Sequence, residues 1–186
     1  FYIIVAILII NYALERILDY LNAKQRSRKL PERLKGLYDE EKYKTSQEYE
    51  QAKNKLSLVS STITLVLMLG MLFSGGFAFV DHLARSATSS PILIALLFFG
   101  VLLFALEIIT LPLSVYKTFV IEERFGFNKA TPKIFAGDTV KSWILGAIIG
   151  GGILALVVWF YQLTTAYFWI YTWIIISVFS DRKSVV

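Results

Sequence analysis

The side chains in this sequence that could do chemistry are polar groups placed inside long apolar segments. Glu107 is followed at helical spacing by Thr110, Ser114 and either Lys117 or Thr118. A carboxylate buried unpaired in a membrane is costly, so it marks a functional site by default. The open alternative is that Glu107 is protonated or paired in a hydrogen bond between helices.

Two further polar stripes recur every three or four residues, a spacing that places side chains on one helix face. They comprise Asn11, Glu15, Asp19 and Asn22, and then Ser57, Ser60, Ser61 and Thr64. Three such stripes favour the walls of one hydrated chamber, and the residues predicted to line it are Asn11, Glu15, Ser61, Glu107 and Ser114. For the first stripe, a position at the membrane interface, where Glu15 and Asp19 are solvated, is an equal alternative.

Few residues of this sequence could support metal or thiol chemistry. The sequence has no cysteine and a single histidine, His82, which excludes disulfides, a cysteine nucleophile and a zinc site built on a pair of histidines within these residues. His82 follows Asp81 on a predicted short loop with no nucleophile pattern nearby, so a structural role is favoured over a catalytic pair. Composition thus excludes these sites, and His82 is not predicted to be catalytic.

The elements that must position the polar groups are membrane-spanning helices. The chain has 186 residues, of which 56% are hydrophobic and 18% charged, with a mean hydropathy of +0.60. A spanning helix needs about 20 mostly apolar residues. The sequence predicts an all-α, multi-pass fold forming a single membrane domain over 1–186, with about five spans at 1–14, 56–80, 91–115, 143–161 and 164–180. Because the chain starts without methionine inside an apolar run, we expect it to be part of a longer protein.

Charge predicts the orientation of these spans, since short loops rich in Lys and Arg stay in the cytoplasm. Segments 24–55 and 116–141 hold ten and five such residues, the tail after residue 180 holds two, and 81–90 holds only Arg85. The N-terminus is therefore predicted outside, with two long loops and the C-terminus in the cytoplasm. Asp39 is predicted to cap a cytoplasmic extension of the second helix over 39–55. We attribute the net charge of +5 to a membrane surface rather than to nucleic acid.

Two strings in the predicted cytoplasmic loops are distinctive. Residues 37–43 read Leu-Tyr-Asp-Glu-Glu-Lys-Tyr, and residues 122–129 read Glu-Glu-Arg-Phe-Gly-Phe-Asn-Lys. Both resemble the N-terminal membrane region of the type I CAAX prenyl proteases, which are integral-membrane zinc metalloendopeptidases. The resemblance covers about residues 11–141 and has the same order of helices.

This resemblance implies a chamber within the membrane and a zinc site on its cytoplasmic side, held by an H-E-x-x-H helix and a later glutamate. That motif is not found in this sequence. Zinc is therefore expected only in a full-length family member, from a C-terminal protease domain that this chain lacks. The expected partners are the lipid bilayer, that missing domain and, in the full-length protein, a peptide substrate.

The loop at 122–129 is the piece of the resemblance that can be tested on this chain. Its predicted substrate-binding or domain-bracing residues are Glu122, Glu123, Arg124, Phe125, Asn128 and Lys129. The alternative is an interfacial loop in which Arg124 pairs with Glu122 or Glu123 and the phenylalanines enter the lipid.

The predicted function is that of the N-terminal membrane domain of a CAAX-type protease that cleaves C-terminal peptides of prenylated, membrane-associated substrates, inactive as this chain alone. The competing functions are a small transporter or channel subunit, suggested by Glu107 and the polar stripes, and a non-catalytic membrane scaffold. The expected membrane is either the bacterial inner membrane or the endoplasmic reticulum.

Overall fold

The computed structural model describes residues 1–25, 39–164 and 167–181, and every regular element in these ranges is helical. In chain order they are α1 (Tyr2–Gln25), α2 (Glu40–Phe73), α3 (Gly76–Ala87), α4 (Pro91–Tyr116), the π-helix η2 (Lys117–Glu122), α5 (Pro132–Leu163) and α6 (Phe168–Asp181). The all-α fold class predicted from the sequence is confirmed.

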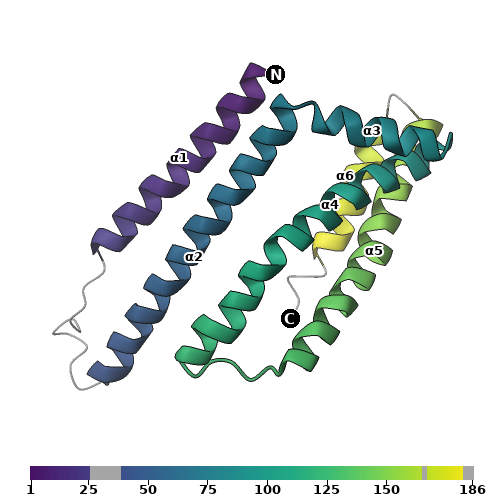
Figure 1. Ribbon diagram of the computed structural model, residues 1–186. Coiled ribbons are helices and arrows are strands. Elements are labelled where there is room, and N and C mark those ends of the chain that lie inside the picture. The colour runs from purple at the N-terminus through teal and green to yellow at the C-terminus, as the bar shows by residue number, and fades with distance from the viewer. Residues whose placement is uncertain (26–38, 165–166, 182–186) are drawn as a thin grey trace. The chain divides into compact units, whose positions relative to one another are not determined.

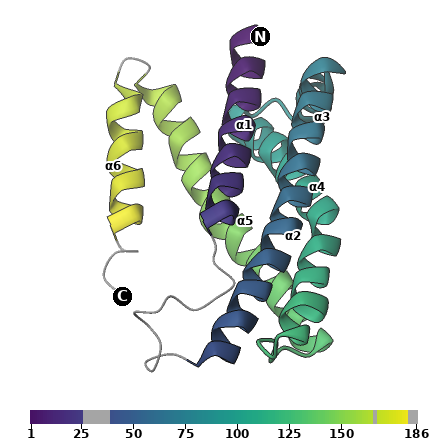
Figure 2. The same cartoon turned by 90° about the vertical axis from the view of Figure 1, so that its left-hand side faces the viewer.

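The helices group into two compact units. One unit comprises residues 1–76 and 108–130, and the other comprises 77–107 with the described part of 131–186. In the first unit α1 lies alongside α2, and the π-helix η2 contacts α2 (Figure 1; Figure 2). In the second unit α5 and α6 pack against each other as a hairpin (Figure 2).

Polar caps fix where the two longest helices begin. Asp39 accepts a hydrogen bond from the backbone N–H of Glu41 at 2.9 Å, which satisfies one of the donors left unpaired in the first turn of α2. At the start of α5, Thr131 accepts from the N–H of Ile134 at 3.3 Å, and Pro132 follows in the first turn, where its missing N–H costs nothing. The predicted cap at Asp39 and the predicted helical extension after it are both confirmed.

The apolar surface of the helices is mostly uncovered by protein. Among the described residues, the buried hydrophobic side chains are Val80, Ala84 and Ile121. Within the same part of the chain, three helical stretches have the length and composition to cross a membrane: Glu41–Phe73, Pro91–Glu122 and Pro132–Leu163. An apolar surface of this extent requires a non-aqueous surrounding.

The second apolar segment was predicted as one span over 56–80, and this is wrong. Helix α2 ends at Phe73, Gly75 turns the chain with a φ of 73°, and a separate helix, α3, follows. A side chain other than glycine is strained at such a φ. Helix α3 also replaces most of the loop predicted at 81–90 and carries His82.

Two helices extend beyond the spans predicted within them, and a third begins later than its predicted span. Helix α1 runs to Gln25 and so includes the polar stripe that reaches Asn22, and α5 begins at Pro132, ahead of the span predicted from residue 143. The last helix begins at Phe168, whereas a span from residue 164 was predicted. In α1 and α5 the polar turns continue the backbone hydrogen-bond ladder, which an apolar count alone does not register.

Candidate functional site

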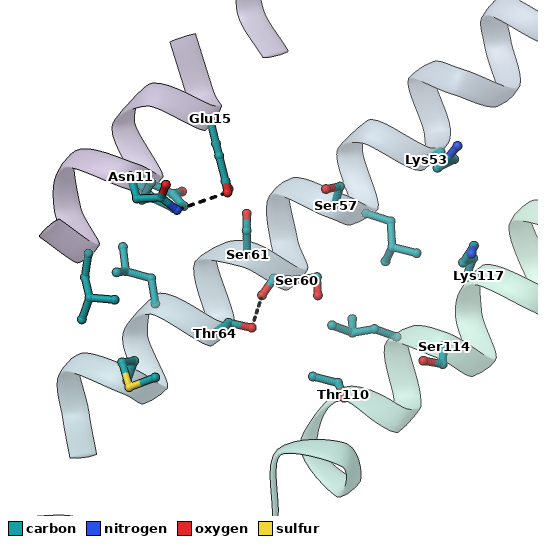
Figure 3. A pocket seen from close by; sticks show the side chains of 16 residues that line it. Asn11, Glu15, Lys53, Ser57, Ser60, Ser61, Thr64, Thr110, Ser114 and Lys117 are labelled. Carbon is teal, nitrogen blue, oxygen red and sulfur yellow. Dashed lines mark hydrogen bonds between the residues drawn. The ribbon is translucent and has the colours of Figure 1, made fainter. Parts of the chain in front are cut away.

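A polar hollow lies within the first unit, between α1, α2, the last turns of α4 and η2 (Figure 3). It has a volume of about 600 Å³. Its lining comprises four side chains of α1 (Leu8, Asn11, Tyr12, Glu15), eight of α2 (Lys53, Leu56, Ser57, Ser60, Ser61, Thr64, Leu65, Met68) and four of α4 and η2 (Thr110, Leu113, Ser114, Lys117). We call this space the polar hollow.

Four of the five residues predicted to line a chamber meet here, namely Asn11, Glu15, Ser61 and Ser114. Glu107 is not among the described residues that line the hollow, and it belongs to the other compact unit. Its role as a chamber-lining residue stays a prediction.

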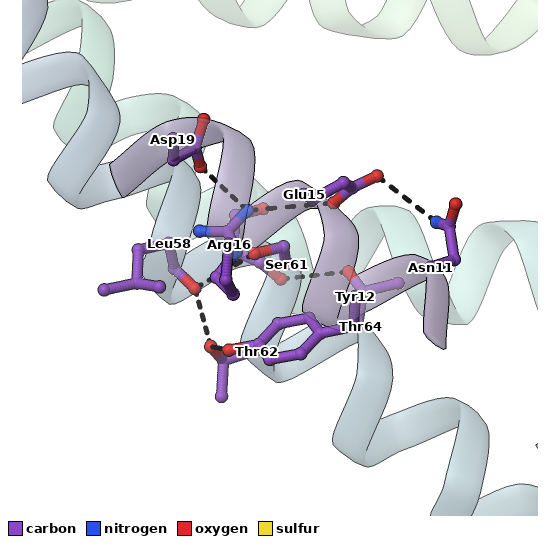
Figure 4. Close-up of polar contacts among 10 residues, drawn as sticks. Asn11, Tyr12, Glu15, Arg16, Asp19, Leu58, Ser61, Thr62 and Thr64 are labelled. Atoms are coloured by element: carbon purple, nitrogen blue, oxygen red, sulfur yellow. Dashed lines mark hydrogen bonds and ion pairs between the residues drawn. The ribbon is translucent and has the colours of Figure 1, made fainter. Parts of the chain in front are cut away.

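The acidic residues of α1 are held in a small ionic network (Figure 4). Asn11 Nδ2 donates to Glu15 Oε1 at 3.3 Å. The guanidinium of Arg16 lies 3.7 Å from Glu15 and 3.1 Å from Asp19, and it also lies 5.3 Å from the centre of the Tyr12 ring. The charge of Glu15 is thus compensated while its carboxylate still lines the hollow.

One hydrogen bond joins α1 to α2, and its direction can be assigned. The hydroxyls of Tyr12 and Thr62 are 2.7 Å apart. Thr62 donates its only hydroxyl hydrogen to the carbonyl of Leu58, also at 2.7 Å. A hydroxyl has one donor and two acceptor sites, so Tyr12 donates and Thr62 accepts.

Hydroxyl hydrogens can be assigned in the same way along the α2 wall of the hollow. Ser61 donates to the Leu58 carbonyl at 3.2 Å and Thr64 to the Ser60 carbonyl at 3.0 Å. Their hydroxyl oxygens therefore present lone pairs to the hollow (Figure 3). Lys53 and Lys117 add two cations to the lining. This surface can hydrate a chain segment, accept hydrogen bonds from backbone N–H groups and attract a carboxylate.

The loop at 122–129 is a closed turn. The backbone N–H groups of Phe127 and Asn128 donate to the Glu122 carbonyl at 2.8 and 3.1 Å, and Gly126 has a φ of 73°. Asn128 Nδ2 donates to Glu123 Oε2 at 2.8 Å, and its own Oδ1 accepts from the N–H of Ala130 at 2.8 Å. The amide of Asn128 thereby fixes both sides of the turn.

The aromatic residues of this loop rest on α2. The ring of Tyr49 lies 5.5 Å from that of Phe125 and 4.8 Å from that of Phe127, centre to centre. Such ring pairs contribute about 0.5–1.5 kcal/mol beyond the area they bury. Both rings thus pack on Tyr49, while Phe127 keeps 56% of its surface exposed. The entry of that ring into lipid, considered from the sequence, stays a prediction.

The charged residues of the loop also differ from the pairing considered above. Within the described part of the chain, Glu122 pairs with Lys117 at 3.7 Å and Glu123 with Asn128, while the guanidinium of Arg124 lies 5.6 Å from the centre of the Phe125 ring. Arg124 and Lys129 are exposed. Periodicity in the sequence does not identify Tyr49 or Tyr12 as contact residues, because each depends on a partner far along the chain.

The described residues contain no group of three His, Cys, Asp or Glu side chains that could hold a metal ion. The zinc site implied by the resemblance therefore does not fit them. Asp81, next to His82 on α3, instead accepts a hydrogen bond from Arg85 Nε at 2.7 Å. This bond, with a smaller contribution from His82, lowers the pKa of Asp81 below its ordinary value.

Long apolar helices that leave their surfaces uncovered, together with a polar hollow beside them, define an α-helical, multi-pass membrane protein. A family model described as the N-terminal region of CAAX prenyl proteases, with five membrane helices, matches residues 19–181. The chain therefore belongs to the CAAX prenyl protease family, as the two loop strings indicated.

Comparisons with individual proteins support the same family. CAAX prenyl protease 1 of Saccharomyces cerevisiae is 33% identical over 159 residues, which are 80% of this chain and 35% of the yeast protein. The homologue from Arabidopsis thaliana is 29% identical over 188 residues, covering 95% of this chain and 44% of the plant protein. The crystal structure of S. mikatae Ste24p matches with a TM-score of 0.84 and 32% identity, covering 96% of this chain and 43% of that one. The chain thus spans less than half the length of these relatives.

Proposed function

We propose that this chain is the N-terminal membrane region of a CAAX-type zinc metalloendopeptidase that removes C-terminal peptides from prenylated, membrane-associated substrates. The polar hollow then forms part of the wall of the intramembrane chamber. The observation that carries this proposal is the gathering of Asn11, Glu15, Ser61 and Ser114 around one space in a member of this family. In this proposal residues 1–186 act as one membrane domain, and zinc and its ligands belong to the protease domain of the full-length protein.

The chemistry of the hollow suits a peptide in transit. Hydroxyl oxygens whose hydrogens are already donated within α2 can accept hydrogen bonds from the N–H groups of an extended chain. Lys53 and Lys117 are paired with Glu50 and Glu122. A C-terminal carboxylate would replace these partners, and in a partly desolvated space its attraction to the two cations is stronger than in water. The hollow therefore binds and orients a substrate, whereas bond cleavage takes place elsewhere.

The loop at 122–129 is proposed to brace the protease domain or to contact the substrate. Glu122, Glu123, Phe125 and Asn128 build the turn and seat it on α2, which leaves the exposed Arg124 and Lys129 facing a partner. The Lys and Arg counts of the loops support a cytoplasmic position for this turn and an N-terminus on the opposite side. The eukaryotic relatives support the endoplasmic reticulum as the membrane.

A chimaera tests the proposal. Yeast CAAX prenyl protease 1 is given this chain in place of its matching region, and release of the C-terminal tripeptide from a prenylated peptide is measured. Ser61→Leu with Ser114→Leu should lower kcat/KM about tenfold, which is about 1.4 kcal/mol of transition-state stabilisation. Ser46→Leu, on α2 outside the hollow, is the matched control and should leave the rate unchanged.

A folded chimaera without cleavage would contradict the protease proposal. If the purified chain in liposomes instead carries ions or solutes without zinc, a transport function replaces it. A separate check is the locus, where the proposal predicts an open reading frame that continues into H-E-x-x-H after residue 186.

A further inference from the structure

A second space in the first unit lies between α2 and the helix formed by the end of α4 with η2. It has a volume of about 830 Å³. Its lining comprises Lys44, Gln47, Glu48, Gln51, Ala52, Lys55, Leu56 and Val59 from α2, with Leu113, Tyr116, Val120, Ile121, Arg124 and Phe125 from the facing segment. We call it the interhelix groove. Its α2 residues recur with steps of three and one, so they form one continuous helix face about 22 Å long.

Polarity changes along this groove. From Lys44 to Gln51 the α2 wall is polar, and Arg124 lies opposite, next to the contact of Tyr49 with Phe125. From residue 52 onward the walls are apolar apart from Lys55, whose long stem can lie along apolar surface while its ammonium reaches toward water. Hence one end of the groove suits a polar, charged group and the other suits a hydrocarbon chain.

The apolar end is open rather than filled by protein. Val59, Tyr116 and Val120 keep 47%, 49% and 47% of their surface exposed although they line the groove. They belong to two helical stretches with the composition to cross a membrane. Within a membrane, such residues are surrounded by hydrocarbon. We therefore expect an acyl chain to occupy the apolar end of the groove.

The polar end has a net positive charge and an unmet hydrogen bond. Lys44 and Arg124 face one carboxylate, Glu48, and Lys55 adds a third cation at the start of the apolar end. The side-chain oxygen of Gln47 is buried and has no hydrogen-bond partner within the described part of the chain. A phosphate diester complements the cations, and a turn of the Gln47 side chain toward the groove would let a hydroxyl or ammonium group of the same headgroup donate to that oxygen.

We propose that the interhelix groove is a binding site for one anionic glycerophospholipid, with its headgroup at Lys44 and Arg124 and one acyl chain along Val59, Leu113 and Val120. Basic pockets between membrane helices are known to select anionic headgroups. The groove adjoins the polar hollow, with which it shares Leu56 and Leu113. The proposal depends on the membrane placement of α2 and α4 but not on peptide cleavage. The lipid fastens the base of the loop at 122–129 to α2.

The proposed binding of an anionic phospholipid is tested by measuring which lipids the chain retains. The chain is reconstituted in phosphatidylcholine nanodiscs doped with phosphatidylserine, and the lipids that it retains on release are identified by native mass spectrometry. The wild-type chain should retain phosphatidylserine selectively. Lys44→Gln with Arg124→Gln should lower that selectivity about fivefold for each charge removed.

Three control variants distinguish binding at the groove from a nonspecific attraction of anionic lipid to the positive charge of the chain. Lys42→Gln with Lys133→Gln removes the same charge from two exposed residues outside the groove and should retain the lipid. Lys44→Arg with Arg124→Lys keeps the charge and should also retain it, which separates lost binding from lost folding. Val59→Trp, which fills the apolar end, should reduce retention with every cation in place.

Three results would overturn the proposal. These are equal retention of phosphatidylcholine and phosphatidylserine, an equal loss in the Lys42 and Lys133 control, and displacement by soluble glycerophosphoserine as effectively as by the lipid. The last result would assign an anion site without a place for the acyl chain.

Discussion

The hydrogen bond from Tyr12 to Thr62 is expected to hold α1 against α2, and its removal gives a defined loss. Tyr12→Phe deletes the donor but keeps the ring that lies beside Arg16, so the change isolates the hydroxyl. Hydrogen bonds between membrane helices average about 0.6 kcal/mol in double-mutant cycles, with a maximum of about 1.7. At 2.7 Å and partly buried, this bond should contribute about 1 kcal/mol, a fivefold change in the ratio of folded to unfolded protein.

The assay is reversible unfolding in mixed micelles, with Tyr12→Phe, Thr62→Val and the double variant forming a cycle. Thr62→Val should cost about 1–2 kcal/mol because it leaves the tyrosine hydroxyl without its acceptor. The coupling between the two changes should be about 1 kcal/mol. Tyr20→Phe is the matched control on the same helix, since Tyr20 is 68% exposed. A coupling energy below about 0.3 kcal/mol between two folded single variants would refute the reasoning.

Three shorter predictions concern the turns and the short helix. Gly126→Ala should destabilise the chain by about 1–3 kcal/mol in thermal unfolding, because the φ of Gly126 is 73°. The added Cβ meets no atom within 4 Å, so the loss reports the backbone conformation alone. Gly137→Ala, in helix α5, is the control and should not destabilise the chain. Arg85 lowers the pKa of Asp81, so the stabilisation of α3 should be present above the ordinary carboxyl pKa and be lost as pH falls through the lowered value. Hydrogen exchange of α3 should show this loss, and Arg85→Gln should remove it. A reporter inserted at 88–90 should lie outside the cytoplasm, and a cytoplasmic signal there would reverse the orientation.

Local signals in the sequence predicted local structure well. Asp39 before two glutamates is a strong helix start, and the ion pair between Glu50 and Lys53, at 3.2 Å, follows from helical spacing alone. The polar stripes also indicated that Asn11, Glu15 and Ser61 would line a common space. Each of these features depends on residues within four positions of one another, so periodicity is sufficient to find them.

Features that depend on a break or on a distant partner were missed. The apolar run through residues 73–80 concealed the end of α2, although the glycine pair at 75–76 was a visible turn signal. The contacts of Tyr49 with Phe125 and Phe127 join segments more than seventy positions apart, and no periodicity within one helix predicts them.

The unbroken length of α2 has a mechanical consequence. Its 34 residues form a rod of about 50 Å at 1.5 Å per residue, which exceeds the thickness of a bilayer's hydrocarbon core by about 20 Å. Since a rod pivots as one piece, each degree of tilt about its apolar end displaces the polar end by about 0.9 Å. Tyr49 lies on that polar arm and holds the turn at 122–129 through two ring contacts. Because tilting is one way in which a helix adapts to bilayer thickness, a change of thickness that tilts α2 would move Tyr49 and the turn that it contacts.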